Sequence, residues 1–114
     1  MNESKPRTER YSFRVVCVPK LVAEEISKKF AHLPCRVNPY FKNEKKFVVS
    51  FPLTKDKNYD ALGKYLVGCK RKMTYGLWVS LGTNRDSDGL TVPKYVCDIY
   101  QKIGGTIDFS FTVL

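Results

Sequence analysis

The sequence has few of the residues that most often build metal, redox and catalytic sites. It contains one histidine in 114 residues, and its four cysteines stand too far apart to form a Cys-x-x-Cys pair. Neither of the glycine-rich phosphate-binding patterns, G-x-x-x-x-G-K and G-x-G-x-x-G, occurs. The aspartates are dispersed, and no pair of them suits acid–base chemistry. We therefore expect a protein that is not an enzyme and that binds no cofactor or metal.

Long apolar runs are also absent. No run approaches the roughly 20 residues that a membrane-spanning helix requires. The first ten residues, MNESKPRTER, lack the apolar core of a secretory signal. These features predict a cytoplasmic protein with no membrane association and with reduced, mostly buried cysteines.

Acidic residues are scarce relative to basic ones. The chain has 20 Lys and Arg against 11 Asp and Glu, which gives a net charge of +9. Such an excess attracts nucleic acids and acidic protein surfaces alike, and it accelerates association with either. Charge therefore leaves both classes of partner open.

Alternating apolar residues predict strands within a single domain. Residues 1–9 are polar and include Pro6, so we expect a flexible tail followed by one domain over residues 10–114. Four segments each place apolar side chains on one side of an extended strand. Their inward positions are Tyr11, Phe13, Val15 and Cys17; Phe47, Val49, Phe51 and Leu53; Tyr75, Leu77, Val79 and Leu81; and Ile107, Phe109, Phe111 and Val113. A further short segment, CRVNPYF, is expected to form a hairpin with FVVSFPL.

Apolar residues at three- and four-residue spacing predict three helices. The first runs between Pro19 and Pro34. The second is capped near Asp56 or Asn58 and continues to Met73. The third has Thr91 as its N-cap and stops at Gly104-Gly105. The predicted order is β-α-β-β-α-β-α-β.

This order favours an α+β fold, a two-layer ferredoxin-like sandwich with a mainly antiparallel sheet and its helices on one face. A third helix and a strand are appended to the basic unit. The opposite face of the sheet is then expected to carry a mixed set of side chains, which makes it a candidate binding surface. That set is Ser12, Arg14, Val16, Ser50, Trp78, Ser80, Asp108 and Ser110.

Two short patterns suggest chemistry only weakly. His32 precedes Cys35 at a helix end, but Pro34 intervenes and no orienting group can be identified, so a helix-terminal histidine is the simpler interpretation. The segment NRDSDG, residues 84–89, matches the first six positions of a calcium loop. The carboxylate required at position 12 would fall on Tyr95, which favours a polar turn.

Basic residues at the end of the second helix are candidates for a partner surface. The segment GCKRKMTYG, residues 68–76, ends this helix, and the buried stripe leaves its Arg71 and Lys72 on one exposed face together with Lys64. These cations either complement the negative end of the helix dipole or contact a partner. The complete set of candidate partner-binding residues is Lys64, Arg71, Lys72, Arg14, Trp78, Lys45 and Lys46.

The stacking platform of an RNA-binding sheet is incomplete. Such a sheet presents aromatic side chains on its open face in a strand of the type K/R-G-F/Y-G/A-F-V-x-F/Y. The nearest segment, KKFVVSF, lacks the glycine, and its phenylalanines fall on the apolar face. Charge and fold still permit RNA binding.

The segment YGLWVSLGTNRDSDGLTVPKYVCDIYQKIGGTIDFSFTVL resembles the C-terminal half of a bacterial family of small uncharacterised domains. The opening YSFRVV and the helix after it are similar to the start of that family. The resemblance implies a binding role, and some small domains of this kind are immunity proteins encoded beside secreted toxins. We therefore expect an immunity or inhibitor protein that neutralises an acidic toxin or effector domain by direct contact, with a basic RNA-binding module as the alternative.

Overall fold

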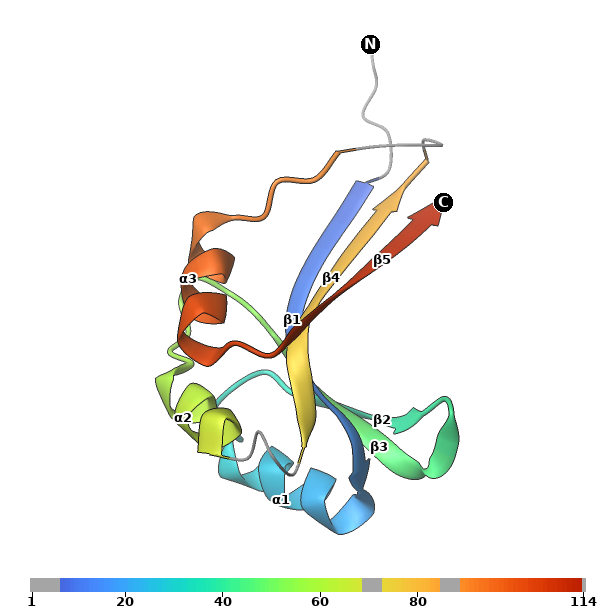
Figure 1. Cartoon of the computed structure of the whole chain (residues 1–114), viewed down its shortest axis with the longest axis vertical. Helices are drawn as coiled ribbons and strands as arrows, with labels where there is room; N and C mark the ends of the chain where they lie inside the picture. Colours follow the sequence, from blue (N-terminus) through green and yellow to red (C-terminus); the bar gives the residue numbers. More distant parts are fainter. Residues whose placement is uncertain (1–6, 69–72, 85–88, 114) are drawn as a thin grey trace.

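The computed structural model describes residues 7–68, 73–84 and 89–113. Strands and helices alternate in the predicted order (Figure 1). They are β1 (Arg7–Pro19), α1 (Lys20–Lys29), β2 (Arg36–Tyr40), β3 (Asn43–Pro52), α2 (Asp60–Gly68), β4 (Thr74–Thr83), α3 (Lys94–Ile103) and β5 (Thr106–Val113). The protein is an α+β protein.

All five strands join one mixed sheet. Their spatial order is β2-β3-β1-β4-β5. The central strand β1 pairs antiparallel with both β3 and β4, and β2 pairs antiparallel with β3 to form the expected hairpin. The fifth strand lies parallel to β4, because α3 carries the chain back to the end of the sheet from which β4 starts. The sheet therefore has five strands in this order, and not the four of the basic ferredoxin-like unit.

The helices lie on one face of the sheet, with α2 and α3 on the left and α1 at the bottom of Figure 1, and enclose the core. Alternating residues of β1, β3 and β4 supply the sheet side, among them the fully buried Phe13 and Phe51. The ring of Phe30, just after α1, meets the ring of Phe51 edge-on with centroids 6.0 Å apart. Asn58 accepts the backbone N–H of Asp60, the first residue of α2, at 2.8 Å, so of the two residues predicted near the cap Asn58 contacts the start of the helix.

Within the described ranges, no helix is both long and apolar enough to cross a membrane.

The first strand departs from simple alternation at Cys17. Pairing between β1 and β3 passes from Val15 with Val49 to Val18 with Phe47, so β1 contains one extra residue at this point. Such a β-bulge reverses the side to which later residues point. Cys17 adopts a positive φ of 63° and is exposed, whereas Val18 is buried in its place. The prediction of an inward Cys17 was therefore wrong.

Three predicted boundaries also need correction. β1 begins at Arg7, so residues 7–9, which the sequence placed in the tail, belong to the sheet. α1 ends at Lys29, although Phe30 and Leu33 beyond it are still buried. α3 begins at Lys94 with Pro93 as N-cap in place of Thr91, and the Pro93 carbonyl accepts the N–H groups of Val96 and Cys97.

The last strand differs most from its prediction. Ile107, Phe109, Phe111 and Val113 share the helix-facing side of the sheet, in register with Leu77, Val79, Leu81 and Thr83 of β4. Their exposed fractions are nevertheless 45%, 68%, 48% and 54%. Alternation identified correctly which residues share a side, but none of the three described helices buries that side of β5.

A glycine on each side allows β4 and β5 to approach. A Cβ atom on Gly76 would collide with the backbone oxygen of Thr106. Gly104 and Gly105 have φ angles of 77° and 95°, which residues with a side chain rarely adopt, and they reverse the chain between α3 and β5. The position of β5 therefore depends on these glycines.

We expect Gly76→Ala to lower the free energy of unfolding by about 1–3 kcal/mol, because the new methyl group forces the two strands apart. Urea denaturation measures the effect. Gly68→Ala is the matched control: no atom lies within 4 Å of the added Cβ, and alanine favours the helix. Equal stability of Gly76→Ala and the wild type would contradict the close strand approach.

Candidate functional site

The face of the sheet away from the helices carries a basic hollow. Three arginines surround it: Arg10 and Arg14 from β1, and Arg36 from β2. Arg14 and Arg36 both pair with Ser50 of β3, so the three residues lie in one row across the sheet. The hollow has a volume of about 630 Å³, and its lining also includes the carboxylate residue Glu9 and, at the side of α3, Tyr95. We call this region, with Trp78 of β4, the outer-face hollow.

Arg14 stacks on Trp78 inside the outer-face hollow. The guanidinium carbon lies 3.8 Å from the centroid of the indole ring. Trp78 pairs with Ser12, two residues before Arg14, so the two side chains are diagonal neighbours on adjacent strands. A cation held over the face of an indole is attracted by the ring, by about 0.5–2 kcal/mol depending on burial. The stack fixes the direction in which the guanidinium presents its N–H groups.

The stacked guanidinium is incompletely satisfied. Its Nε atom is buried and has no hydrogen-bond partner in the part of the chain that the structure describes. Burial lowers the pKa of Arg14, and the negative charge of Asp108 opposes this by raising it. Asp108 reaches this face because it lies in register with Trp78. A guanidinium stays charged under these conditions, so Arg14 keeps a positive charge on this face of the sheet.

The structure brings together only two of the predicted site residues, Arg14 and Trp78. By alternation Lys46 shares their face of the sheet, four residues along β3 from Ser50, while Lys45 points to the other side. Lys64 lies on α2, in the helix layer, so the sheet separates it from the outer-face hollow. Arg71 and Lys72 lie outside the described residues. The predicted set is therefore not one site.

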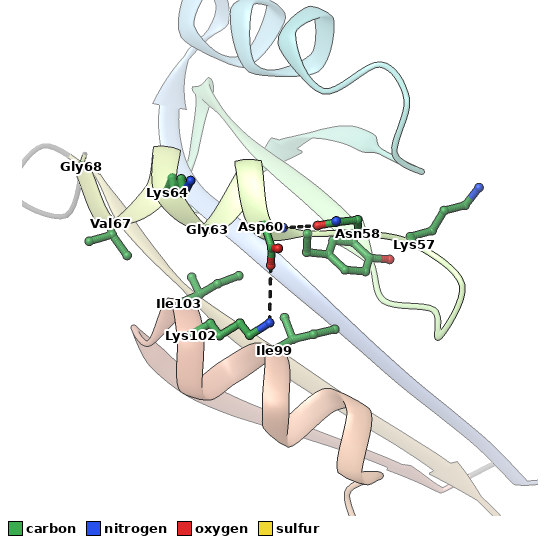
Figure 2. A pocket seen from close by; sticks show the side chains of 11 residues that line it. Lys57, Asn58, Asp60, Gly63, Lys64, Val67, Gly68, Ile99, Lys102 and Ile103 are labelled. Carbon is green, nitrogen blue, oxygen red and sulfur yellow. Dashed lines mark hydrogen bonds and ion pairs between the residues drawn. The ribbon is translucent and has the colours of Figure 1, made fainter.

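Lys64 borders a groove between α2 and α3 (Figure 2). The groove has a volume of about 730 Å³, and Gly63 allows the helices to come close, because an added Cβ would lie 2.9 Å from Ile103. Lys102 forms an ion pair with Asp60 across it, with Nζ 3.5 Å from Oδ1. This pair neutralises one of the cations at the groove. The outer-face hollow has the better defined polar chemistry.

The weaker sequence candidates gain no chemistry from the structure. Burial is the main influence on Cys35 and raises the pKa of its thiol, although a hydrogen bond with Ser27 opposes it. A reactive thiol requires a lowered pKa. Positions 85–88 of the calcium-like segment lie outside the described residues, so that prediction stays open. Within the described ranges no three His, Cys, Asp or Glu side chains gather as a metal site would require.

Two arginines of the outer-face hollow were missed by the sequence analysis. Arg10 has the same parity as Arg14 along β1, so continuing the alternation by two residues past Ser12 would have found it. Arg36 could be found only from the pairing of β2 with β3, which places it beside Ser50. The position of Arg10 could therefore be predicted from the sequence, whereas that of Arg36 required the register of β2 on β3.

We expect Arg14→Ala to uncover the indole of Trp78. The tryptophan is the only one in the chain, so its fluorescence reports this site alone. The emission maximum should move to longer wavelength, quenching by acrylamide should increase, and stability should fall by about 0.5–2 kcal/mol. Arg36→Ala, which removes an arginine from the same face but not from the ring, is the control. Identical spectra for the two variants would argue against the stack.

No protein-family model, no curated protein and no solved structure matches this chain. The resemblance to a family of small bacterial domains therefore stays a prediction.

Proposed function

We propose that this is a non-enzymatic binding protein that captures an acidic protein partner on the outer-face hollow. The observation that carries the proposal is the Arg14–Trp78 stack, which holds a cation over an indole ring on the outer face of the sheet. Arginine and tryptophan are enriched among the residues that dominate binding energy at protein interfaces. A carboxylate of the partner, placed in the hollow, would accept from the guanidinium in a charge-assisted hydrogen bond.

The charge of the chain supports the same proposal. A net charge of +9 accelerates encounter with an acidic surface. Arg10 and Arg36 are exposed beside the stack, and neither forms an ion pair with another described residue. They are available to pair with carboxylates at the edge of an interface, where they would affect the association rate more than the final affinity.

Within this proposal, the biological role is that of an immunity or inhibitor protein of the cytoplasm. Its partner is an acidic toxin or effector domain that it neutralises by direct contact. Proteins encoded by the neighbouring genes are the first partners to test.

The ferredoxin-like core is part of the same proposal. α1 connects β1 to β2 and α2 connects β3 to β4, and in each case one other strand lies between the two that are connected. This arrangement supports a split β-α-β unit repeated twice, to which α3 and β5 are added. The outer-face hollow then belongs to the core unit, since β5 contributes no arginine to it.

The proposal is tested by co-expression and by titration calorimetry with the products of the neighbouring genes. We expect the wild type to protect cells from one of them and Arg14→Glu to fail. The same substitution should weaken binding by on the order of 30-fold or more, because it reverses the charge at the centre of the interface.

Lys45→Glu and Lys64→Glu are matched controls, because they make the same change of charge away from the hollow. Both should bind within about threefold of the wild type. Two results would contradict the proposal: protection against none of the neighbouring products, or equal loss of affinity in all three variants.

RNA binding is the second candidate, and one observation favours it. Three arginines and a tryptophan lie on an open sheet face, which is the kind of surface that binds single strands. However, Arg14 already covers one face of the indole, which leaves fewer surfaces for a base to stack on.

If RNA binds here, affinity for a fluorescent single-stranded RNA should fall steeply with salt. Three neutralised phosphates give a slope of about −2 in a plot of log K against log salt concentration. Arg10→Ala should make that slope less steep by the contribution of one neutralised phosphate. Lys45→Ala, the control, should leave the slope unchanged. Absence of binding at low salt would exclude this candidate.

A further inference from the structure

The last strand combines two features that edge strands rarely have together. β5 pairs with β4 on one side only, and no other described residue pairs with its second side. Its helix-facing residues Ile107, Phe109, Phe111 and Val113 are between 45% and 68% exposed. These four make up half of the exposed large apolar side chains among the described residues. An open edge beside an apolar row is a template for pairing with another strand.

The opposite edge of the sheet is protected in the usual way. β2 has only five residues, from Arg36 to Tyr40, and it contains Pro39, which lacks a backbone N–H. Short length, a cation and a proline are the devices by which edge strands avoid pairing. β5 is eight residues long and contains neither proline nor a basic residue. The two edges of one sheet therefore differ in a way that points to a partner at β5.

The charge on β5 identifies the partner as a second copy of this chain. Two molecules that each carry +9 repel, so a self-contact is favoured where the surface has few cations. None of the 20 Lys and Arg lies between Thr106 and Val113, and the one charge on the strand is the carboxylate of Asp108. An acidic partner protein would instead be attracted to a basic edge, which β5 is not.

The sequence of β5 is also self-complementary. When two copies pair antiparallel about Ser110, Phe109 lies opposite Phe111 of the second copy, and Ile107 lies opposite Val113. Aromatic and aliphatic pairs of this kind stabilise adjacent strands. Asp108 then lies opposite Thr112, so the two carboxylates do not face each other. We propose that the protein forms a two-fold symmetric dimer in which β5 pairs with β5 of a second copy, centred on Ser110.

The first test is sedimentation equilibrium over protein concentrations from micromolar to millimolar. The wild type should approach twice the chain mass of 13.1 kDa. Phe109→Lys should raise the dimer dissociation constant by at least about tenfold, because it places a cation opposite Phe111 of the other copy. Its side chain is 68% exposed, so the fold should survive, and circular dichroism checks this.

Phe41→Lys is the matched control. Phe41 lies between β2 and β3 and is 86% exposed, so the substitution and the added charge are the same. It should leave the dissociation constant within about twofold of the wild type. A monomeric wild type, a dimer that tolerates Phe109→Lys, or equal weakening by both substitutions would overturn the proposal.

The second test examines the register. Thr112→Asp places carboxylates opposite each other twice in the dimer, whereas Thr112→Lys creates two pairs of opposite charge. The aspartate variant should therefore dimerise at least about fivefold more weakly than the lysine variant. General repulsion between basic molecules predicts the reverse order, because the lysine variant has the higher net charge. The reverse order, or equal constants, would overturn pairing centred on Ser110.

The dimer does not depend on the proposed function. Arg14→Glu removes the attraction between Arg14 and Asp108 but leaves the apolar row of β5 unchanged, so it should lose its acidic partner and still dimerise. Loss of dimer in Arg14→Glu would contradict the separation of the two surfaces. Capture of an acidic partner by a monomeric wild type would support the proposed function and exclude the dimer.

Discussion

Coverage of the sheet is the constraint on which the rest of the structure depends. Each helix has nine or ten residues and is therefore about 15 Å long, whereas β1 alone extends over 13 residues. Three such helices can cover one face of β1, β3 and β4, and there the side chains are fully buried. The outer face of the sheet and the helix-facing side of β5 are left to solvent. The outer-face hollow and the apolar row on β5 are the two surfaces that this short helix layer does not cover.

The two uncovered surfaces differ in the kind of side chain that they carry. On the outer face the side chains are mostly polar, with serines between the arginines, Asp108 close enough to influence Arg14, and Trp78 held under Arg14. On the helix side of β5 they are large and apolar. The first kind suits a charged ligand that brings its own acceptors, since a buried guanidinium donor gains most from a carboxylate. The second kind suits removal from water by another apolar surface.

Much of the fold could be predicted from the sequence, because alternation and helical spacing are local signals. They placed all eight elements in order and identified the inward faces of β1, β3 and β4. The bulge at Cys17 was not predictable, because it depends on the pairing of β1 with β3. The exposure of Phe109 was not predictable either. Alternation shows which side chains share a face, but coverage of that face is a property of the whole packing.

The candidate site was predictable in the same partial sense. Arg14 and Trp78 share an outward parity, and the sequence placed them on one face without showing that they touch. Lys64 has the same charge as Arg14, but the sheet lies between them, so composition grouped residues that the fold separates. The number of charges in a sequence does not indicate on which side of the sheet each charged side chain lies. Only the register of β2, β3 and β1 gathers Arg36 with Arg14.

A symmetric pairing at β5 would make the protein bivalent. The two-fold axis of an antiparallel strand pair is perpendicular to the sheet, so both helix layers would lie on one side and both outer-face hollows on the other. Counting five strand spacings from β1 of one copy to β1 of the other places the hollows about 24 Å apart. A partner that presents two acidic sites at that separation would be held by both, and the second contact would form at the high effective concentration of a tethered site. The open edge at β5 would then raise the avidity of a surface on which it has no residue.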